Sequence, residues 1–455
     1  MEPARGEEAS THADPSLAVR TTDIEDLSIQ GFFDVARADS VDAAPADASA
    51  RPRVVWRPPE GDFLAAIGAS ASCVADGAGR FGSIREEGSE LFAALETDPE
   101  APRVARPRLF GGFSFLPDTH SGPWKGVPDA RFVLPKVQFA STEAESWLTV
   151  IGDSEGIEAR LADWRDRVAA VLDSPSRTAP SIEHAERTTS RARWHEQVET
   201  ALSRIDSAAL RKVVLAQSLS VSLDDAVSMP RTLSQLAGSY PECFCFSFPP
   251  DEGRRDFFGA TPERLVSVRG ENVTTGALAG SIERGRTDAE DHRLAGALAD
   301  SEKNDREHAL VAEAIADQLD SIARSVTIGE RDVRKLATVQ HLYTPIEAEL
   351  AGNEHVLSLV EALHPTPAVG GLPPDAAAET LRAIEAFDRG WYAAPVGWFD
   401  AAGDGTFAVA IRSAVADGRQ ATLFAGNGIV AGSDPSEEWE EVQLKYRPIL
   451  DALGL

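Results

Sequence analysis

The clearest alternation of apolar and polar residues lies in KVVLAQSLSVSL, at 212–223, and has the period of two that is typical of a β-strand. The pattern places Lys212, Val214 and Ala216 on one face. Further strands are predicted at 243–248, 264–269, 405–415 and 420–426. In the predicted strand 405–415, Arg412 shares its face with alanines, as Lys212 does with small residues. Small neighbours leave room for a ligand beside each cation, but two cations that extend from strand ends into water explain the pattern equally well.

Helical spacing indicates two long helices, at 301–325 and 435–453. In the first, Val311, Ile315 and Leu319 form an apolar stripe, and Glu307 lies one turn further along the same face. A carboxylate at the end of a buried stripe requires a partner.

The second helix has a well-marked start, with Ser433 or Asp434 as N-cap and proline at or near its first position. Glu438, Glu441 and Lys445 share one face of it. Spacing alone favours a surface pair between Glu441 and Lys445 worth about 0.3–0.5 kcal/mol. Carboxylates without a histidine or cysteine cluster also suit a hard cation such as Mg²⁺. Glu307 and Glu441 are the candidate ligands, if the fold brings them together.

The N-terminal part predicts a different organisation. Residues 1–53 form a polar segment that is partly disordered, with 1–25 expected to fray and 38–53 expected to be a linker or exposed loop. Residues 54–193 contain short apolar runs broken by glycine and proline and a helix at 158–173, which predicts a β-rich half. In residues 194–455 strands often follow one another directly, which favours a mixed α/β or α+β arrangement over regular βαβ winding.

Charge and composition exclude several classes of protein. The chain has 73 acidic and 44 basic residues, a net charge of −29, which argues against nucleic acid or an anionic membrane as partner. No apolar run has the length of a membrane span, and the first residues lack the pattern of a signal peptide, so a cytoplasmic protein is expected. Excess acid with few lysines indicates adaptation to high salt.

The region 195–453 resembles the chorismate-utilising enzymes, and among them the isochorismate synthases, whereas residues 1–190 match only loosely. The resemblance rests on eight ordered motifs: RKVVLAQS (211–218), FFGATPERLVSV (257–268), TGALAGSIERG (275–285), SEKNDREHALVAEAI (301–315), VQHLYTPIEAEL (339–350), LHPTPAVGGLP (363–373), FAVAIRSA (407–414) and AGNGIVAGSDPSEEWEEVQLK (425–445).

The resemblance implies two packed, mainly antiparallel β-sheets flanked by helices, an Mg²⁺ cofactor and chorismate as substrate, with the two halves intertwined in one structural unit. It implies that Glu307 and Glu441 are metal ligands and that Glu438 acts nearby or through water. Arg412 is similar to the residue that holds the enolpyruvyl carboxylate, a role that suits a bidentate donor.

Other positions take their implied roles from the same motifs. Lys445 and the backbone of Gly426 and Gly428 would hold carboxylate oxygens. Lys212 resembles the general base that activates water at ring C2, and Glu263 resembles the general acid that protonates the departing C4 hydroxyl. This chemistry requires a neutral lysine and a protonated glutamate.

The reaction is inferred from the residues that distinguish branches of the family. Amino-transferring relatives carry glutamine at the position of Lys212 or lysine at that of Ala279, so the pair found here favours water as nucleophile. Salicylate synthases share this pair, but the HPTP motif with His364 and Thr366 is more similar to the isochorismate synthases. Ser281 replaces a threonine of several relatives and keeps the hydroxyl.

The remaining assignments are of the same kind. His341 is assigned to the substrate site, although it and His364 also fit a structural role, and His308 is a possible neighbour of the metal ligands. We therefore expect an isomerase, an isochorismate synthase that supplies menaquinone synthesis and is a monomer or weak dimer. The alternatives are a salicylate synthase, a siderophore pathway, an amino-transferring component, or an inactive relative kept as a chorismate-binding subunit.

Overall fold

The computed structural model describes residues 17–41, 52–118, 120–170 and 179–454. They form two large sheets in which the paired strands are antiparallel, together with the helices that flank them. The 12-stranded sheet contains, in spatial order, β1 (Leu17–Ile24), β8 (Ser146–Asp153), β7 (Val137–Ser141), β3 (Phe63–Ile67), β2 (Arg53–Arg57), β11 (Phe244–Phe248), β12 (Asp256–Thr261), β21 (Ser413–Asp417), β22 (Gln420–Ile429), β10 (Lys212–Leu223) and β18 (Gly371–Leu372), with β9 (Ile182–Arg187) also paired to β10.

The second sheet is 10-stranded. It contains, in spatial order, β15 (Ala323–Ile328), β17 (Val339–Leu350), β14 (Asn272–Glu283), β13 (Arg264–Arg269), β20 (Gly405–Val409), β19 (Pro395–Asp400), β5 (Arg108–Phe113), β6 (Ala130–Leu134) and β4 (Ala71–Ala75), with β16 (Asp332–Lys335) paired to β17. The α+β class and the two antiparallel sheets expected from the sequence are confirmed.

The helices of the described residues are α1 (Ile29–Val41), α2 (Arg80–Ala93), α3 (Ile157–Ala169), α4 (Arg191–Asp206), α5 (Met229–Ser239), α6 (Asp288–Ala299), α7 (Glu302–Asp320), α8 (Val356–Leu363), α9 (Pro374–Ile384) and α10 (Pro435–Leu453). Within the described ranges, none of them is long and apolar enough to cross a membrane.

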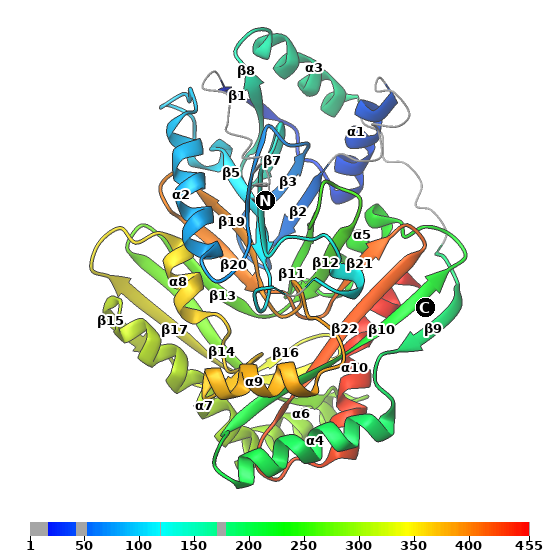
Figure 1. The fold of residues 1–455 in the computed structure, drawn as a ribbon. Coiled ribbons are helices and arrows are strands. Elements are labelled where there is room, and N and C mark those ends of the chain that lie inside the picture. Colours follow the sequence, from blue (N-terminus) through cyan, green and yellow to red (C-terminus); the bar gives the residue numbers. More distant parts are fainter. Residues whose placement is uncertain (1–16, 42–51, 119, 171–178, 455) are drawn as a thin grey trace, which may run out of the picture.

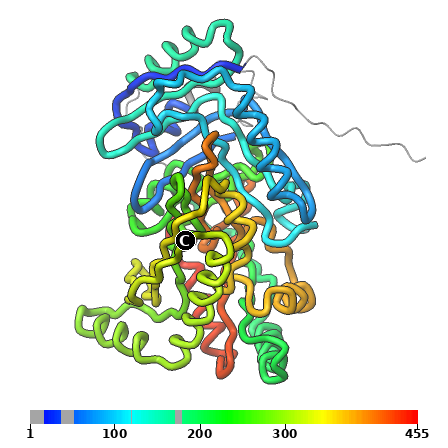
Figure 2. Tube along the Cα trace, turned by 90° about the vertical axis from the view of Figure 1, so that its left-hand side faces the viewer, coloured from blue at the N-terminus to red at the C-terminus, as the bar shows by residue number. Residues whose placement is uncertain are grey.

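Both sheets are shared between the two halves of the chain. β2 pairs with β11 in the larger sheet, and β5 pairs with β19 in the smaller one. Figure 1 places the N-terminal elements in its upper part and α4, α7, α9 and α10 in its lower part, and Figure 2 shows the same division from the side. Each half therefore completes sheets that the other half also builds.

The N-terminus is more regular than its composition indicates. Leu17–Ile24, expected to fray, forms β1 and pairs along its whole length with β8. Part of the polar segment is thus a sheet strand, because its consecutive apolar residues Leu17, Ala18 and Val19 are buried where it pairs with a strand that is distant in sequence. The expected disorder and linker of residues 1–16 and 42–51 lie outside the described residues.

The predicted strand 405–415 is wrong as one continuous element. β20 ends at Val409 in the smaller sheet and β21 begins at Ser413 in the larger one. Between them Arg412 has a positive φ of 50°, so its side chain does not share a strand face with the alanines on either side. The chain crosses from one sheet to the other here, an event set by tertiary structure and not by the local alternation.

A second crossing runs beside the first. β12 ends at Thr261 in the larger sheet, and β13 begins at Arg264 in the smaller one. The Val409 amide donates to the Glu263 carbonyl at 3.0 Å, and the Thr261 hydroxyl donates to the Val409 carbonyl at 2.6 Å. These hydrogen bonds join the two crossings. Glu263 lies in one of them and Arg412 in the other, so both residues lie between the sheets.

Candidate active site

A pocket lies between the two sheets and is lined by residues of both. β10, β14, β17, β22, α7, α10 and both sheet crossings contribute to it. The predicted site residues that line it are Lys212, Glu263, Ala279, Ser281, Glu307, His341, Arg412, Gly426, Gly428, Glu438, Glu441 and Lys445. Residues separated by more than 200 positions in sequence therefore meet in one cavity.

Lys212 and Glu307 form an ion pair inside the pocket, with 3.0 Å between Nζ and Oε1. Lys212 is the first residue of β10 and is 1% exposed. Glu307 lies in α7, and its stripe of buried residues is confirmed. A Cβ at Gly428 would lie 2.5 Å from the Glu307 carboxylate, so any side chain there would force this pair to shift.

Glu438 is 2% exposed and contacts two partners that the sequence did not point to. Lys303 Nζ donates to its Oε1 at 2.9 Å, and the Asn427 amide donates to its Oε2. Burial raises the pKa of Glu438, and the charge of Lys303 opposes that shift. Glu438 therefore anchors α10 to α7 and β22.

Glu441 and Lys445 form a pair with 3.0 Å between Oε1 and Nζ. The expected N-cap is confirmed, since Asp434 accepts from the Ser436 and Glu437 amides. Lys445 Nζ also donates to the Gly426 carbonyl at 3.1 Å. Because both side chains line the pocket, the surface interpretation of this pair is wrong.

Three pocket carboxylates thus face three lysines, which is relevant to a metal ion. Glu307, Glu438 and Glu441 are not among the described groups in which three ligand atoms all lie within 4.8 Å of one another. Mg²⁺ nevertheless takes only one or two protein carboxylates and fills its other positions with water and substrate oxygens. The oxygen donors of this pocket therefore fit Mg²⁺ without forming a closed protein cage.

Glu263 is 6% exposed, and its pKa suits the role of a proton donor. Burial raises the pKa of Glu263 to about 7, against the opposing charges of Lys212 and Arg412. A substantial fraction of this carboxyl therefore carries its proton near neutral pH, which meets the requirement for a proton donor.

Arg412 is a buried cation that faces the pocket. Its Nη2 donates to His341 Nε2 at 2.7 Å, and its Nη1 finds no hydrogen-bond acceptor in the described part of the chain. Burial, together with the charges of Arg412 and Lys445, lowers the pKa of His341 well below its ordinary value. The neutral imidazole accepts from Arg412, and its Nδ1 lies 3.1 Å from the Ser281 hydroxyl. This chain of contacts fixes the guanidinium and leaves Nη1 for a ligand.

Three other residues singled out in the sequence lie outside the lining. The Thr366 hydroxyl is buried near Glu263, without a hydrogen bond of good geometry to any described residue. His364 Nε2 lies 3.0 Å from the Phe115 carbonyl. His308 lies between the Thr344 hydroxyl, at 2.8 Å, and the Ala279 carbonyl, at 3.3 Å. The last two therefore have structural contacts rather than a place beside the carboxylates.

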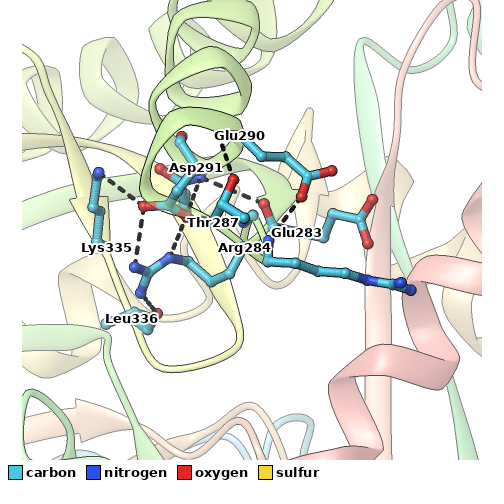
Figure 3. Close-up of polar contacts among 10 residues, drawn as sticks. Glu283, Arg284, Thr287, Glu290, Asp291, Lys335 and Leu336 are labelled. Atoms are coloured by element: carbon cyan, nitrogen blue, oxygen red, sulfur yellow. Dashed lines mark hydrogen bonds and ion pairs between the residues drawn. The ribbon is translucent and has the colours of Figure 1, made fainter.

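The strands that carry Ser281 and His341 are held together at their ends by Asp291 of α6. Figure 3 shows the Asp291 carboxylate between Arg284 and Lys335. Arg284 Nε donates to Asp291 Oδ1 at 2.6 Å, and Lys335 Nζ donates to Asp291 Oδ2 at 2.9 Å. Arg284 chiefly, with Lys335, holds the pKa of Asp291 far below its usual range. Since Arg284 follows β14 and Lys335 ends β16, this ionised carboxylate joins the ends of two strands in the sheet that carries Ser281 and His341.

Sequence reasoning missed Lys303, Asn427 and the long strands β14 and β17 that line the pocket. Lys303 precedes Glu307 by four positions, so helical spacing was a usable signal. Asn427 lies in a glycine-rich segment, AGNGIVAG, that looks like a turn but continues β22. No local pattern marks that asparagine as a partner of Glu438.

Comparison with known proteins identifies the family to which this fold and site belong. Residues 23–454 match the family described as chorismate binding enzyme, and the chain belongs to that family. The chain is 36% identical to isochorismate synthase MenF of Bacillus subtilis over 80% of this chain and 78% of that protein. It is 37% identical to the salicylate biosynthesis isochorismate synthase of Pseudomonas aeruginosa over 89% of this chain and 85% of that protein.

Solved structures agree with the fold. The chain is similar to MenF, the menaquinone-specific isochorismate synthase from Escherichia coli, with a TM-score of 0.78 and 24% identity over 97% of this chain and 95% of that one. At 24% identity, this similarity shows a shared fold.

Proposed function

We propose that this chain is an Mg²⁺-dependent isochorismate synthase that interconverts chorismate and isochorismate. The observation that carries the proposal is the convergence in one pocket of Lys212, the buried carboxyl of Glu263 and the guanidinium of Arg412. A buried cation without a carboxylate partner calls for an anionic ligand. A base and an acid beside it provide the two proton transfers of a hydroxyl exchange.

In this proposal the substrate is held by its two carboxylates. Arg412 binds the enolpyruvyl carboxylate through Nη1, while His341 holds the guanidinium through Nη2. Lys445 and the backbone at Gly426 and Gly428 hold carboxylate oxygens. Ala279 and Ser281 line the pocket around the substrate, and the Thr366 hydroxyl lies near Glu263 outside the lining.

The chemistry then needs one proton removed and one proton supplied. Lys212 Nζ takes a proton from water as its oxygen bonds to ring C2. Glu263 gives a proton to the C4 hydroxyl, which leaves as water while the ring double bonds shift. One water enters and one leaves, so chorismate and isochorismate remain isomers. The small Ala279 leaves room for that water.

Glu307 and Glu441 would hold the Mg²⁺ ion, with Glu438 behind them or acting through water. When bound there, the ion would neutralise a substrate carboxylate. In the present structure Glu307 forms an ion pair with Lys212, and Glu441 forms one with Lys445. Each carboxylate that would hold the ion is therefore within reach of an amine that the proposal assigns to the substrate or to water.

Product analysis tests the proposal against its nearest rival, a salicylate synthase, which would go on to eliminate pyruvate. The purified chain is incubated with chorismate and Mg²⁺, and isochorismate, salicylate and pyruvate are measured. Isochorismate without pyruvate supports the proposal, whereas salicylate and pyruvate in equal amounts would replace it. An inactive chorismate-binding subunit would bind chorismate and form none of these products.

The physiological setting follows from weaker signals. We propose a cytoplasmic enzyme, monomeric or weakly dimeric, whose product supplies menaquinone synthesis rather than a siderophore. Its charge of −29 supports adaptation to high salt, because screening relieves repulsion between surface carboxylates. Deletion of the coding sequence should lower menaquinone, and a loss of siderophore alone would reverse this assignment.

A further inference from the structure

A cluster of metal-ligating side chains lies in the N-terminal half, outside the pocket. Asp76, His120 and Asp129 each offer a ligand atom, and these atoms all lie within 4.8 Å of one another. Asp76 directly follows β4, and Asp129 directly precedes β6. Because Ala75 of β4 pairs with Ala130 of β6, the two aspartates are brought together by the register of the sheet.

Backbone amides hold the carboxylates of both aspartates in place. The Gly77 and Asp118 amides donate to Asp129 Oδ2 at 2.8 and 3.0 Å. The Asp129 amide donates to Asp76 Oδ1 at 2.9 Å. Each carboxylate thus uses one oxygen to fix its orientation and keeps the second for another partner, as metal-ligating carboxylates do.

The remaining oxygen of Asp129 points to a ligand. Asp129 is 0% exposed, and its Oδ1 accepts no hydrogen bond within the described residues. His120 Nε2 lies 3.8 Å from this oxygen, which is too long for a hydrogen bond. Arg80 is nearby, but its guanidinium donates to the Gly77 and Ser114 carbonyls. A buried carboxylate oxygen left in this state is costly unless an ion binds it.

We propose that Asp76, His120 and Asp129 bind a divalent first-row transition ion, for which Zn²⁺ is the probe. One imidazole and two carboxylates suit such an ion and are a less suitable set for Mg²⁺. Two carboxylate ligands also balance the charge of a divalent ion. Asp76 and His120 are exposed, so water can complete the coordination and the ion can enter from solvent.

The ion would fix a segment that reaches the catalytic half. The connection between β5 and β6 includes the described residues 114–118 and 120–129, and its Phe115 amide donates to the Gly390 carbonyl at 2.6 Å. The Phe115 carbonyl faces His364 Nε2 at 3.0 Å. The Ser121 amide donates to the Asp388 carboxylate at 2.8 Å. Binding would therefore stabilise the contact between the two halves without adding a group to the pocket.

The test uses the full chain, freed of metal by a chelator and titrated with Zn²⁺ by calorimetry. The wild-type chain should bind one Zn²⁺ that is absent from the His120→Ala and Asp76→Asn variants. Both substitutions are at exposed positions, and asparagine keeps the Oδ1 acceptor of residue 76. His184→Ala, at an exposed position on β9, is the matched control and should bind as the wild type does.

A second variant separates this site from the pocket. Zn²⁺ binding at Asp76, His120 and Asp129 should persist in Glu441→Gln. Zn²⁺ should also raise the melting temperature of the wild type and of Glu441→Gln, but not that of His120→Ala, because a ligand stabilises only the state that binds it. Equal binding by His120→Ala and the wild type, or no Zn²⁺ bound by the wild type, would overturn the proposal.

Discussion

Lys212 and Glu307 face each other across the pocket, with 3.0 Å between amine and carboxylate. Lys212 is the first residue of strand β10, and Glu307 lies in helix α7, almost 100 positions later. Gly428, which has no side chain, provides the space in which they meet. In the proposed function the two have separate tasks, since the lysine is the base and the glutamate is a metal ligand. The proposed function therefore requires that this ion pair open, so that the amine can act on water and the carboxylate can bind the metal ion.

Glu307→Gln should weaken Mg²⁺ binding, because it removes the charge but keeps the shape of the side chain. The Mg²⁺ concentration that gives half-maximal turnover should rise by at least about 10-fold. The measurement is initial rate against Mg²⁺ at saturating chorismate. Glu313→Gln, at an exposed position of the same helix, is the control. An unchanged Mg²⁺ dependence would remove Glu307 from the metal site.

Lys212→Ala should lower kcat by roughly 10²- to 10⁴-fold, the usual contribution of a general base. Chorismate binding, followed by calorimetry, should persist because Arg412 and Lys445 remain. Lys125→Ala, at an exposed position, should leave turnover unchanged. Full turnover by Lys212→Ala would show that another group activates the water.

The pH dependence of turnover should follow the titration of Glu263. Its proton is the one donated, and burial raises the pKa of Glu263 to about 7. As pH rises through this value the carboxyl loses its proton, so kcat should fall on the alkaline side. In Glu263→Gln turnover should be low, and that alkaline fall should disappear from the pH–rate profile. A variant that keeps the same alkaline limb would assign the limb to another group.

The sequence predicted most of the elements that carry these residues and could not predict how they meet. The strand at 212–223 and the helix at 435–453 have the predicted bounds, because each has a strong local period and α10 has an aspartate cap. The break at Arg412 has no local signal, since the residues around it alternate like one strand. Sheet crossings are fixed by partners distant in sequence.

The same limit applies to the site. A carboxylate at the end of the apolar stripe of α7 signalled that Glu307 needs a partner, but only the fold identifies Lys212. Lys303 and Asn427 were missed because their partner, Glu438, is 135 and 11 positions away from them, respectively. The family motifs supplied residues that periodicity alone leaves ambiguous, such as Lys445.

Arg412→Lys should raise the KM for chorismate, since a lysine keeps the charge but loses the planar pair of donors. We expect roughly a 10- to 100-fold increase, the equivalent of one or two hydrogen bonds to a charged group. Arg324→Lys, on the exposed ion pair with Glu349, is the matched control. If Arg412→Lys leaves KM unchanged, the guanidinium does not hold the substrate carboxylate.

The most direct test of the central claim is the origin of the C2 oxygen. The purified chain is incubated with chorismate and Mg²⁺ in water enriched in heavy oxygen, and the isochorismate is analysed by mass spectrometry. If Lys212 activates water, the product carries one heavy oxygen at C2 and the chorismate recovered early in the reaction carries none. Isochorismate without the label would mean that the C4 hydroxyl migrates within the substrate, which would contradict the assigned roles of Lys212 and Glu263.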